Sequence, residues 1–512
     1  REKITPTRTP DLIRHAILQH QLTQEKVCVL DGYALSQLQE NTTASLTRQL
    51  NSRDFLDSPH PSNELVISIA NAVPPITDIV HTEFSQHNAT ELLKLHQQFP
   101  QMKITEHYLS LILENTLIDS LATQPLPLAL FKQVESLVID NPGYKLSSSI
   151  LNKLLKQTTQ LKRLELTYLA NVNDVNFSSF ILKNLEVLTL RETDISVEKL
   201  GDILMQATKL KQLTLRGYKR LDAALPKLTL TNLESLNLAF CTVSASNLKK
   251  LLSKTTQLKA LNLSEVYNLD GHYFDSLILN QLETLHLTNL INSNQVLSKT
   301  PRLKKLNLSD MTVETPSIPL TDLQSLDLFR CKLSVNTLSQ FLNKTTQLEV
   351  LDIHVCDTLN TNFLNKLTLP HLKTVSLKST NISAYNLSWL ISESAQLQVL
   401  DLSGCKALND ELNHELNLPD LFSFNADHSN ISANNLNQLL SQATQITVLR
   451  LENCQNLDGP LNHHLPLSQL KLLELPFSNI TTENLETLLR QAPDLEYLNI
   501  INCSNLRLTP SL

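Results

Sequence analysis

The sequence of 512 residues is long enough for two or three ordinary domains or for one elongated repeat array. Its 43 Lys and Arg residues against 50 Asp and Glu residues give a formal net charge of −7, without a basic cluster that would neutralise several phosphates, which argues against nucleic-acid binding. No apolar run is long enough to insert into a membrane. Only seven Gly and one Trp favour a scaffold over an enzyme with glycine-rich loops.

Residues 1–125 are the least regular part of the chain, and we expect them to form an N-terminal cap. Residues 10–20, 89–100 and 105–121 have helical patterns. Short β-like segments precede helical patterns at residues 26–30, 64–70 and 101–105. A degenerate-repeat β/α cap that covers the first edge of the following repeats and an independent helical domain both fit this pattern.

From residue 126 to residue 512 the chain repeats the pattern LxxLxL, in which Val, Ile or Phe can replace Leu. Sixteen copies can be aligned between Val134 and Leu495, spaced by 24 or 25 residues almost throughout. The phrase SKTTQLKALNL at residues 253–263 returns with small changes as KQTTQLKRLEL and NKTTQLEVLDI. This period is typical of leucine-rich repeats, whose strand-plus-return unit must stack to bury its apolar face. The segment therefore resembles a leucine-rich-repeat solenoid.

Two types of repeat alternate along this segment. One type continues as LxLxxTxISxxNLxxLLxxTTQL, where Ser or Thr predicts an N-cap and the Leu spacing predicts an α-helix of about two to three turns. The other type, LxLxxCxxLxD, lacks helical periodicity and predicts an extended or 3₁₀ return; it is similar to the cysteine-containing repeats of F-box leucine-rich-repeat proteins. We therefore predict an α/β solenoid, a leucine-rich-repeat horseshoe with a concave parallel sheet and convex helices alternating with irregular returns.

The cysteines recur at one position of the repeat, three residues after the last apolar residue of LxxLxL. Those at this position are Cys241, Cys331, Cys356, Cys405, Cys454 and Cys503. Because parallel strands stack about 4.8 Å apart, cysteines two repeats apart lie beyond disulfide reach. We expect reduced, inward-facing thiols that pack and satisfy backbone groups, which fits an intracellular location.

Histidines are the other candidates for metal or acid–base chemistry. They gather at positions 81, 87, 96 and 107, and at the adjacent pair His463 and His464. The side chains of the adjacent pair should diverge, and no Cys or carboxylate stands at a ligand spacing. The sequence also lacks GxSxG, P-loop, GxGxxG and HExxH motifs. We therefore expect no catalytic residue, metal or cofactor, and a chain that is not an enzyme.

The concave face of the sheet is the surface most suited to recognition. Alternate residues of each strand point out of the sheet, and aromatic and Arg residues dominate interface energetics. The candidate partner-binding residues are Tyr168, Arg191, Arg216, Phe240, His286, Asp327, Phe329, Arg330, Asp352, His354 and Phe477. Asp327, Phe329, Arg330, Asp352 and His354 fall on two adjacent repeats and predict a binding site, whereas scattered surface decoration is the alternative for any single residue.

These features predict a monomeric, non-enzymatic module that binds another protein through its concave face. The composition, rich in Asn, Gln, Lys and Leu, together with this repeat style resembles the leucine-rich-repeat effectors that intracellular bacteria inject through the Dot/Icm type IV secretion system. The resemblance implies a virulence role, passage from the bacterial cytoplasm into the host cell, and a host protein as partner. Without it, we expect a cytoplasmic location.

Two other classes of function remain open from the sequence. The cysteine-containing repeats favour a substrate-recognition adaptor of a ubiquitin ligase, although residues 1–125 lack a convincing F-box. An enzyme is the other class, with its catalytic part in residues 1–125 or beyond this sequence, since the chain begins at Arg1 and we expect the natural protein to be longer.

Overall fold

The computed structural model describes most of the repeat segment and five strands that precede it. The described residues are 27–31, 64–69, 76–81, 103–104, 110–113, 132 and 134–506, the last range with gaps at 141–146, 170–171, 220, 222–229, 267–268, 270, 291, 315, 317, 319, 357–358, 360–368 and 393. The chain divides into two compact units, Arg1–Val243 and Ser244–Leu512.

The first four strands form a sheet of their own in the order β1-β2-β3-β4. They are β1 (Val27–Asp31), β2 (Glu64–Ile69), β3 (Ile76–His81) and β4 (Lys103–Ile104). β1 pairs with β2 and β2 with β3 in antiparallel fashion, whereas β3 and β4 are parallel. The predicted strands at β1, β2 and β4 are confirmed, and β3 was not predicted.

The helix predicted over residues 105–121 is wrong at β5 (Ser110–Leu113). These residues form a strand that pairs in parallel with β6, with Leu111 opposite Leu137. A short apolar run such as SLIL fits a helix or a buried strand equally well, and pairing with a neighbouring strand decides between them. The helices predicted over residues 10–20 and 89–100 lie outside the described residues, and the nature of the cap stays a prediction.

Parallel strands stack in register through the rest of the first unit. Strands β6 to β9 carry the second and third apolar residues of LxxLxL, such as Leu188 and Leu190 in β8, whereas β10 carries the second, Leu236, and these side chains are buried. The strands are β6 (Ser136–Asp140), β7 (Arg163–Thr167), β8 (Val187–Arg191), β9 (Gln212–Arg216) and β10 (Ser235–Asn237).

The second unit continues the same parallel pattern, so that β6 to β21 correspond to the sixteen predicted repeats and the leucine-rich-repeat solenoid is confirmed. Its strands are β11 (Ala260–Leu263), β12 (Thr284–Thr288), β13 (Lys305–Ser309), β14 (Ser325–Asp327), β15 (Val350–Asp352), β16 (Thr374–Ser376), β17 (Val399–Asp401), β18 (Ser423–Asn425), β19 (Val448–Arg450), β20 (Leu472–Glu474) and β21 (Tyr497–Asn499).

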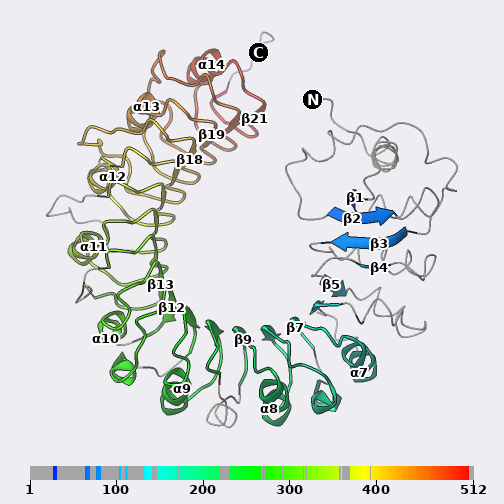
Figure 1. Ribbon diagram of the computed structural model, residues 1–512. Helices are drawn as coiled ribbons and strands as arrows, with labels where there is room; N and C mark the ends of the chain where they lie inside the picture. The colour runs from blue at the N-terminus through cyan, green and yellow to red at the C-terminus, as the bar shows by residue number, and fades with distance from the viewer. Residues whose placement is uncertain are drawn as a thin grey trace, which may run out of the picture. The chain divides into compact units, whose positions relative to one another are not determined.

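Helices return the chain in alternate repeats, on the side opposite the strands within each unit (Figure 1). Most begin at a Ser or Thr whose side chain accepts a hydrogen bond from a backbone N–H three residues on, as Ser383 does from Asn386 at 3.2 Å. The predicted caps are thus confirmed. The helices are α7 (Ser148–Gln157), α8 (Val197–Gln206), α9 (Ala245–Leu252), α10 (Ser293–Leu297), α11 (Val335–Leu342), α12 (Ala384–Ile391), α13 (Ala433–Gln442) and α14 (Thr482–Gln491).

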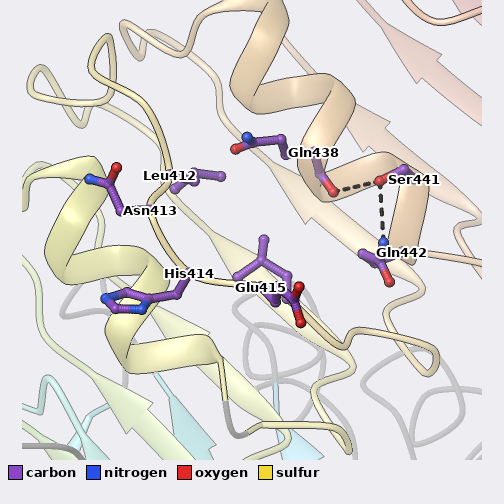
Figure 2. A pocket seen from close by; sticks show the side chains of 8 residues that line it. Leu412, Asn413, His414, Glu415, Gln438, Ser441 and Gln442 are labelled. Carbon is purple, nitrogen blue, oxygen red and sulfur yellow. Dashed lines mark hydrogen bonds between the residues drawn. The ribbon is translucent and has the colours of Figure 1, made fainter.

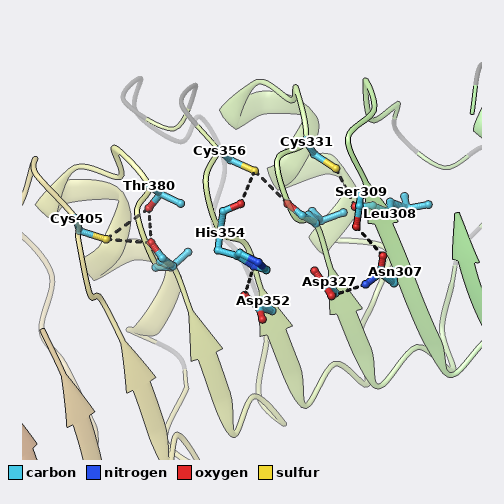
Figure 3. A network of polar contacts seen from close by, with 12 residues as sticks. Asn307, Leu308, Ser309, Asp327, Cys331, Asp352, His354, Cys356, Thr380 and Cys405 are labelled. Carbon is cyan, nitrogen blue, oxygen red and sulfur yellow. Dashed lines mark hydrogen bonds and ion pairs between the residues drawn. The ribbon is translucent and has the colours of Figure 1, made fainter. Parts of the chain in front are cut away.

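The repeat cysteines point inward, as predicted, and bond to the backbone of the preceding repeat (Figure 3). The thiol of Cys331 donates to the carbonyl of Leu308 at 2.9 Å, and that of Cys356 donates to the carbonyl of Leu328 at 3.1 Å. Burial raises the pKa of Cys331 to about 12 and that of Cys405 to about 11. These thiols are therefore neutral, poorly nucleophilic packing groups.

Buried asparagines join each of the last helices to the irregular return of the preceding repeat. Asn386, Asn435 and Asn484 are at most 3% exposed and stand at the same helix position. The Nδ2 of Asn435 donates to the carbonyls of Leu408 at 2.8 Å and Asp410 at 2.6 Å. The two repeat types thus form one structural pair.

Candidate functional site

The five residues that the sequence groups together, Asp327, Phe329, Arg330, Asp352 and His354, are called the mid-array cluster below. Asp327 ends β14 and lies directly opposite Asp352, which ends β15. Phe329 and Arg330 follow β14, and His354 follows β15. The structure therefore places all five on neighbouring repeats of the second unit.

Direct contacts connect these side chains. The rings of Phe329 and His354 stack with their centroids 4.4 Å apart and an angle of 27° between their planes. The Arg330 guanidinium carbon lies 5.4 Å from the centroid of the Phe329 ring, and its Nη2 is 2.7 Å from Asp310 Oδ1. His354 Nδ1 is 2.9 Å from Asp352 Oδ1. Aromatic, cationic and anionic groups thus form one connected surface patch.

Asp327 is a half-buried member of the mid-array cluster. The side-chain amide of Asn307 donates to Asp327 Oδ2, Oδ1 is buried, and the Phe329 backbone N–H also donates to this carboxylate. Burial and then the charge of Asp352 raise the pKa of Asp327, against the opposing effects of His354, the Phe329 backbone and Asn307. Two carboxylates in adjacent register therefore repel each other here.

The candidate residues of the first unit lie on β8, on β9 or just after a strand. The Arg216 guanidinium carbon is 4.6 Å from the ring centroid of Phe240, whose side chain is 46% exposed. The backbone N–H of Tyr168 donates to the carbonyl of Arg191 at 2.9 Å. The structure thus joins Arg216 and Phe240 in a cation–π contact that the sequence did not predict.

The two remaining candidates, His286 and Phe477, lie in the second unit outside the mid-array cluster. Burial and the charge of Lys305 lower the pKa of His286, which keeps its ring neutral at neutral pH. Phe477 is 51% exposed and follows β20. Its backbone N–H donates to the carbonyl of Ile501, a 62% exposed residue that the sequence did not single out. These positions form separate parts of the surface.

Several candidate residues share an unusual backbone conformation. Tyr168, Phe240, Arg330 and Phe477 have φ values of 53°, 60°, 53° and 59°. Each stands two residues after the last apolar residue of LxxLxL, a position that is left-handed in all repeats that begin at Leu161 or later. Non-glycine residues adopt this region at a cost of about 1–2 kcal/mol. Gly217 and Gly404 at this position are the sequence signal for it.

A polar hollow of about 470 Å³ lies between the return at Leu412–Leu416 and α13 (Figure 2). The Ser441 hydroxyl donates to the Gln438 carbonyl at 2.9 Å. The ring of His414 packs edge-on against Trp389, with 4.6 Å between their centroids. His414 points away from Ser441 in the hollow, so these groups do not converge as a nucleophile and base would.

His463 and His464, whose side chains are expected to diverge, lie in the return that precedes α14. His463 Nδ1 lies 3.5 Å from the Thr487 hydroxyl. Neither histidine belongs to a group of three potential metal ligands among the described residues. The side chains of the histidines at positions 81, 87, 96 and 107 lie outside the described residues.

Comparisons with known proteins agree with leucine-rich repeats. Residues 315–414 match a family model described as "FBD-associated F-box protein At5g56370, LRR repeats". A search of curated proteins gives no significant match. Within the part of the chain that the structure describes, no helix is long and apolar enough to cross a membrane.

Solved structures with a similar fold have low sequence identity. A leucine-rich-repeat protein of Leptospira interrogans is 18% identical, with a TM-score of 0.46 over 76% of this chain and 99% of that chain. An internalin of Listeria monocytogenes is 20% identical, with a TM-score of 0.42 over 61% of this chain and 88% of that chain. TLR13, solved with ssRNA13, is 17% identical, with a TM-score of 0.47 over 84% of this chain and 72% of that chain. The chain carries leucine-rich repeats, a type of repeat that generally mediates protein–protein interaction.

Proposed function

We propose that this chain is a non-enzymatic protein-binding module and that the mid-array cluster lies within its binding surface. The observation that carries the proposal is the contact network in which half-buried Phe329 and His354 join exposed Arg330 on the sheet side of the second unit. Aromatic and Arg side chains that are held in place by neighbours lose little freedom on binding, and such residues supply most of the energy at protein interfaces.

The chemistry of the other candidate groups supports binding over catalysis. Cys331 and Cys405 are neutral because burial raises their pKa, and the polar hollow beside α13 does not gather catalytic groups. The open face of stacked strands instead offers rows of side chains over many repeats, which suits an extended protein surface.

A binding measurement with a double variant tests the proposal. Partners captured by the wild-type chain are purified, and their affinity for the Phe329→Ala/Arg330→Ala variant is measured by calorimetry. We expect at least a 30-fold loss of affinity, which corresponds to about 2 kcal/mol for the loss of a central contact.

The matched control removes an aromatic residue and an Arg from the return side of the second unit. Tyr273 lies in the 3₁₀ turn Gly271–Phe274, and Arg490 lies in α14. The Tyr273→Ala/Arg490→Ala variant should bind as the wild type does. Equal binding by both double variants, with circular dichroism showing both folded, would place the binding surface elsewhere.

The family match at residues 315–414 favours a second candidate function, a substrate-recognition adaptor of a ubiquitin ligase. In this function the repeats would bind the substrate and residues 1–125 would bind the ligase core. Co-purification of the whole chain with a ligase core subunit tests it. Failure to bind such a subunit removes this candidate and leaves the protein-binding proposal intact.

The resemblance of composition and repeat style to Dot/Icm effectors predicts that the partner is a host protein. Capture from eukaryotic and bacterial lysates in parallel tests this prediction. A partner found in the bacterial lysate alone would contradict it.

A further inference from the structure

Two carboxylates and an imidazole converge within the mid-array cluster. Asp327 and Asp352 are opposite each other in the parallel ladder, and His354 follows Asp352 by two residues. One ligand atom from each side chain lies within 4.8 Å of the other two, and no other group of three potential metal ligands occurs among the described residues. Figure 3 shows the three side chains next to one another where β14 and β15 end.

A second feature concerns the hydrogen bonds of the Asp327 carboxylate. Oδ1 is buried, and the donors to this carboxylate are two neutral groups, the Asn307 amide at Oδ2 and the Phe329 backbone N–H. Burying a carboxylate is costly when only neutral groups donate to it, and the adjacent Asp352 adds repulsion. A bound cation would supply both a contact for Oδ1 and the opposite charge.

The neighbouring side chains fix the ligands but do not neutralise them. The ring of Phe329 stacks on His354 at 4.4 Å between centroids, which restricts rotation of the imidazole. Arg330, the arginine of the mid-array cluster, pairs with Asp310 at 2.7 Å. The cluster therefore keeps two carboxylates side by side while its one arginine is paired with Asp310.

We propose that Asp327, Asp352 and His354 bind a divalent transition-metal cation, for which Zn²⁺ is the best match. Imidazole combined with carboxylates suits such cations, whereas Ca²⁺ and Mg²⁺ take oxygen ligands. Ligand atoms around a tetrahedral Zn²⁺ lie about 3.4 Å apart, so the separations of up to 4.8 Å close by about 1.4 Å through side-chain rotation. Three protein ligands leave one position for water or for a group of another molecule. The proposal does not depend on protein binding.

Calorimetric titration of the whole, chelator-treated chain with ZnCl₂, MnCl₂ and CaCl₂ tests the proposal. We expect one Zn²⁺ to bind per chain, more tightly than Mn²⁺, and Ca²⁺ to give no measurable heat. Asp327→Asn and His354→Gln should each weaken Zn²⁺ binding at least tenfold, because each removes a ligand atom. Co²⁺ bound to the wild type should show the intense visible absorption of a four-coordinate site.

The control is Asp401→Asn, since Asp401 ends β17 at the same outward position and lies opposite Ser376 and Asn425 rather than a carboxylate. This variant should bind Zn²⁺ as the wild type does. The proposal is overturned if the wild type binds no Zn²⁺, if Ca²⁺ binds more tightly, or if folded Asp327→Asn and His354→Gln variants retain wild-type affinity. The Co²⁺ spectrum of the wild type is decisive on its own if a variant fails to fold.

Discussion

At the scale of single residues, the ionised carboxylate of Asp327 on the sheet face lowers the stability of the folded chain. Its carboxylate faces Asp352 in the ladder, and burial and the charge of that neighbour raise its pKa. The folded chain therefore keeps this proton to a higher pH than the unfolded chain does. The free energy of unfolding falls as the pH rises from the unfolded pKa, about 3.9, through the folded pKa, and it stays lower above that pH.

Asp327→Asn should remove the loss of stability that ionisation of Asp327 causes as the pH rises. In the presence of a chelator, we expect the variant to have a free energy of unfolding higher by a few tenths to about 1 kcal/mol at neutral pH, because directly opposed like charges destabilise a strand pair by this amount. The gain should vanish about one pH unit below the unfolded pKa of about 3.9, where the carboxyl is protonated in both states. Denaturant unfolding over a pH series measures it. A gain that is independent of pH would contradict the electrostatic cause.

At the scale of the elements, buried amides attach α13 to the chain that precedes it. The side chain of Asn435 donates to the carbonyls of Leu408 and Asp410, and its Oδ1 accepts from the Leu412 N–H at 3.3 Å. Water cannot replace these bonds because Asn435 is 1% exposed. The helix and the irregular return therefore depend on each other.

Asn435→Leu should lower the free energy of unfolding by about 3 kcal/mol, since it leaves buried backbone groups without partners. Asn437→Ala on the same helix is the control. Asn437 donates to the Pro460 carbonyl at 2.9 Å in an exposed position, where water can take over the bond. We expect a loss below about 1 kcal/mol there. Similar losses in both variants, measured by denaturant unfolding, would contradict the role of the buried amide.

At the scale of the whole molecule, the repeats contact mainly their neighbours, so a local change should spread over a short distance only. In Asn435→Leu, we expect faster amide exchange in β17, β18 and β19, and unchanged exchange in β11 and β12 of the same unit. Hydrogen exchange with mass spectrometry measures this gradient. A uniform loss of protection over the unit would show that it unfolds as one cooperative body.

The repeat scaffold could be predicted from the sequence because each of its rules is local. The Leu spacing predicts the strands, Ser and Thr predict the helix starts, and the cysteine position predicts the inward thiols. β5 was missed because an apolar run of four residues has no period of its own. The role of Asn435 was missed because its partners lie 23 to 27 residues earlier in the chain.

The candidate site could be predicted in part. The outward strand positions indicate that Asp327 and Asp352 share a face, but the opposition of the two carboxylates depends on a register that only the structure gives. Phe329, Arg330 and His354 lie beyond the strand ends, where alternation no longer decides direction. The stacking of Phe329 on His354 therefore could not be predicted from spacing.

The left-handed residue that follows each strand from β7 to β21 has a consequence for changing this chain by design. Where a non-glycine residue occupies it, its conformation is nearly constant, from φ 49° at Glu192 to φ 60° at Phe240, although these residues are as different as Phe, Glu, Ser and Val. The backbone is thus set by the stacked repeats and not by the residue itself. A new side chain placed at Ser379 or Val355 would start from the same backbone conformation. The affinity for a chosen ligand can therefore be varied there without redesigning the repeats.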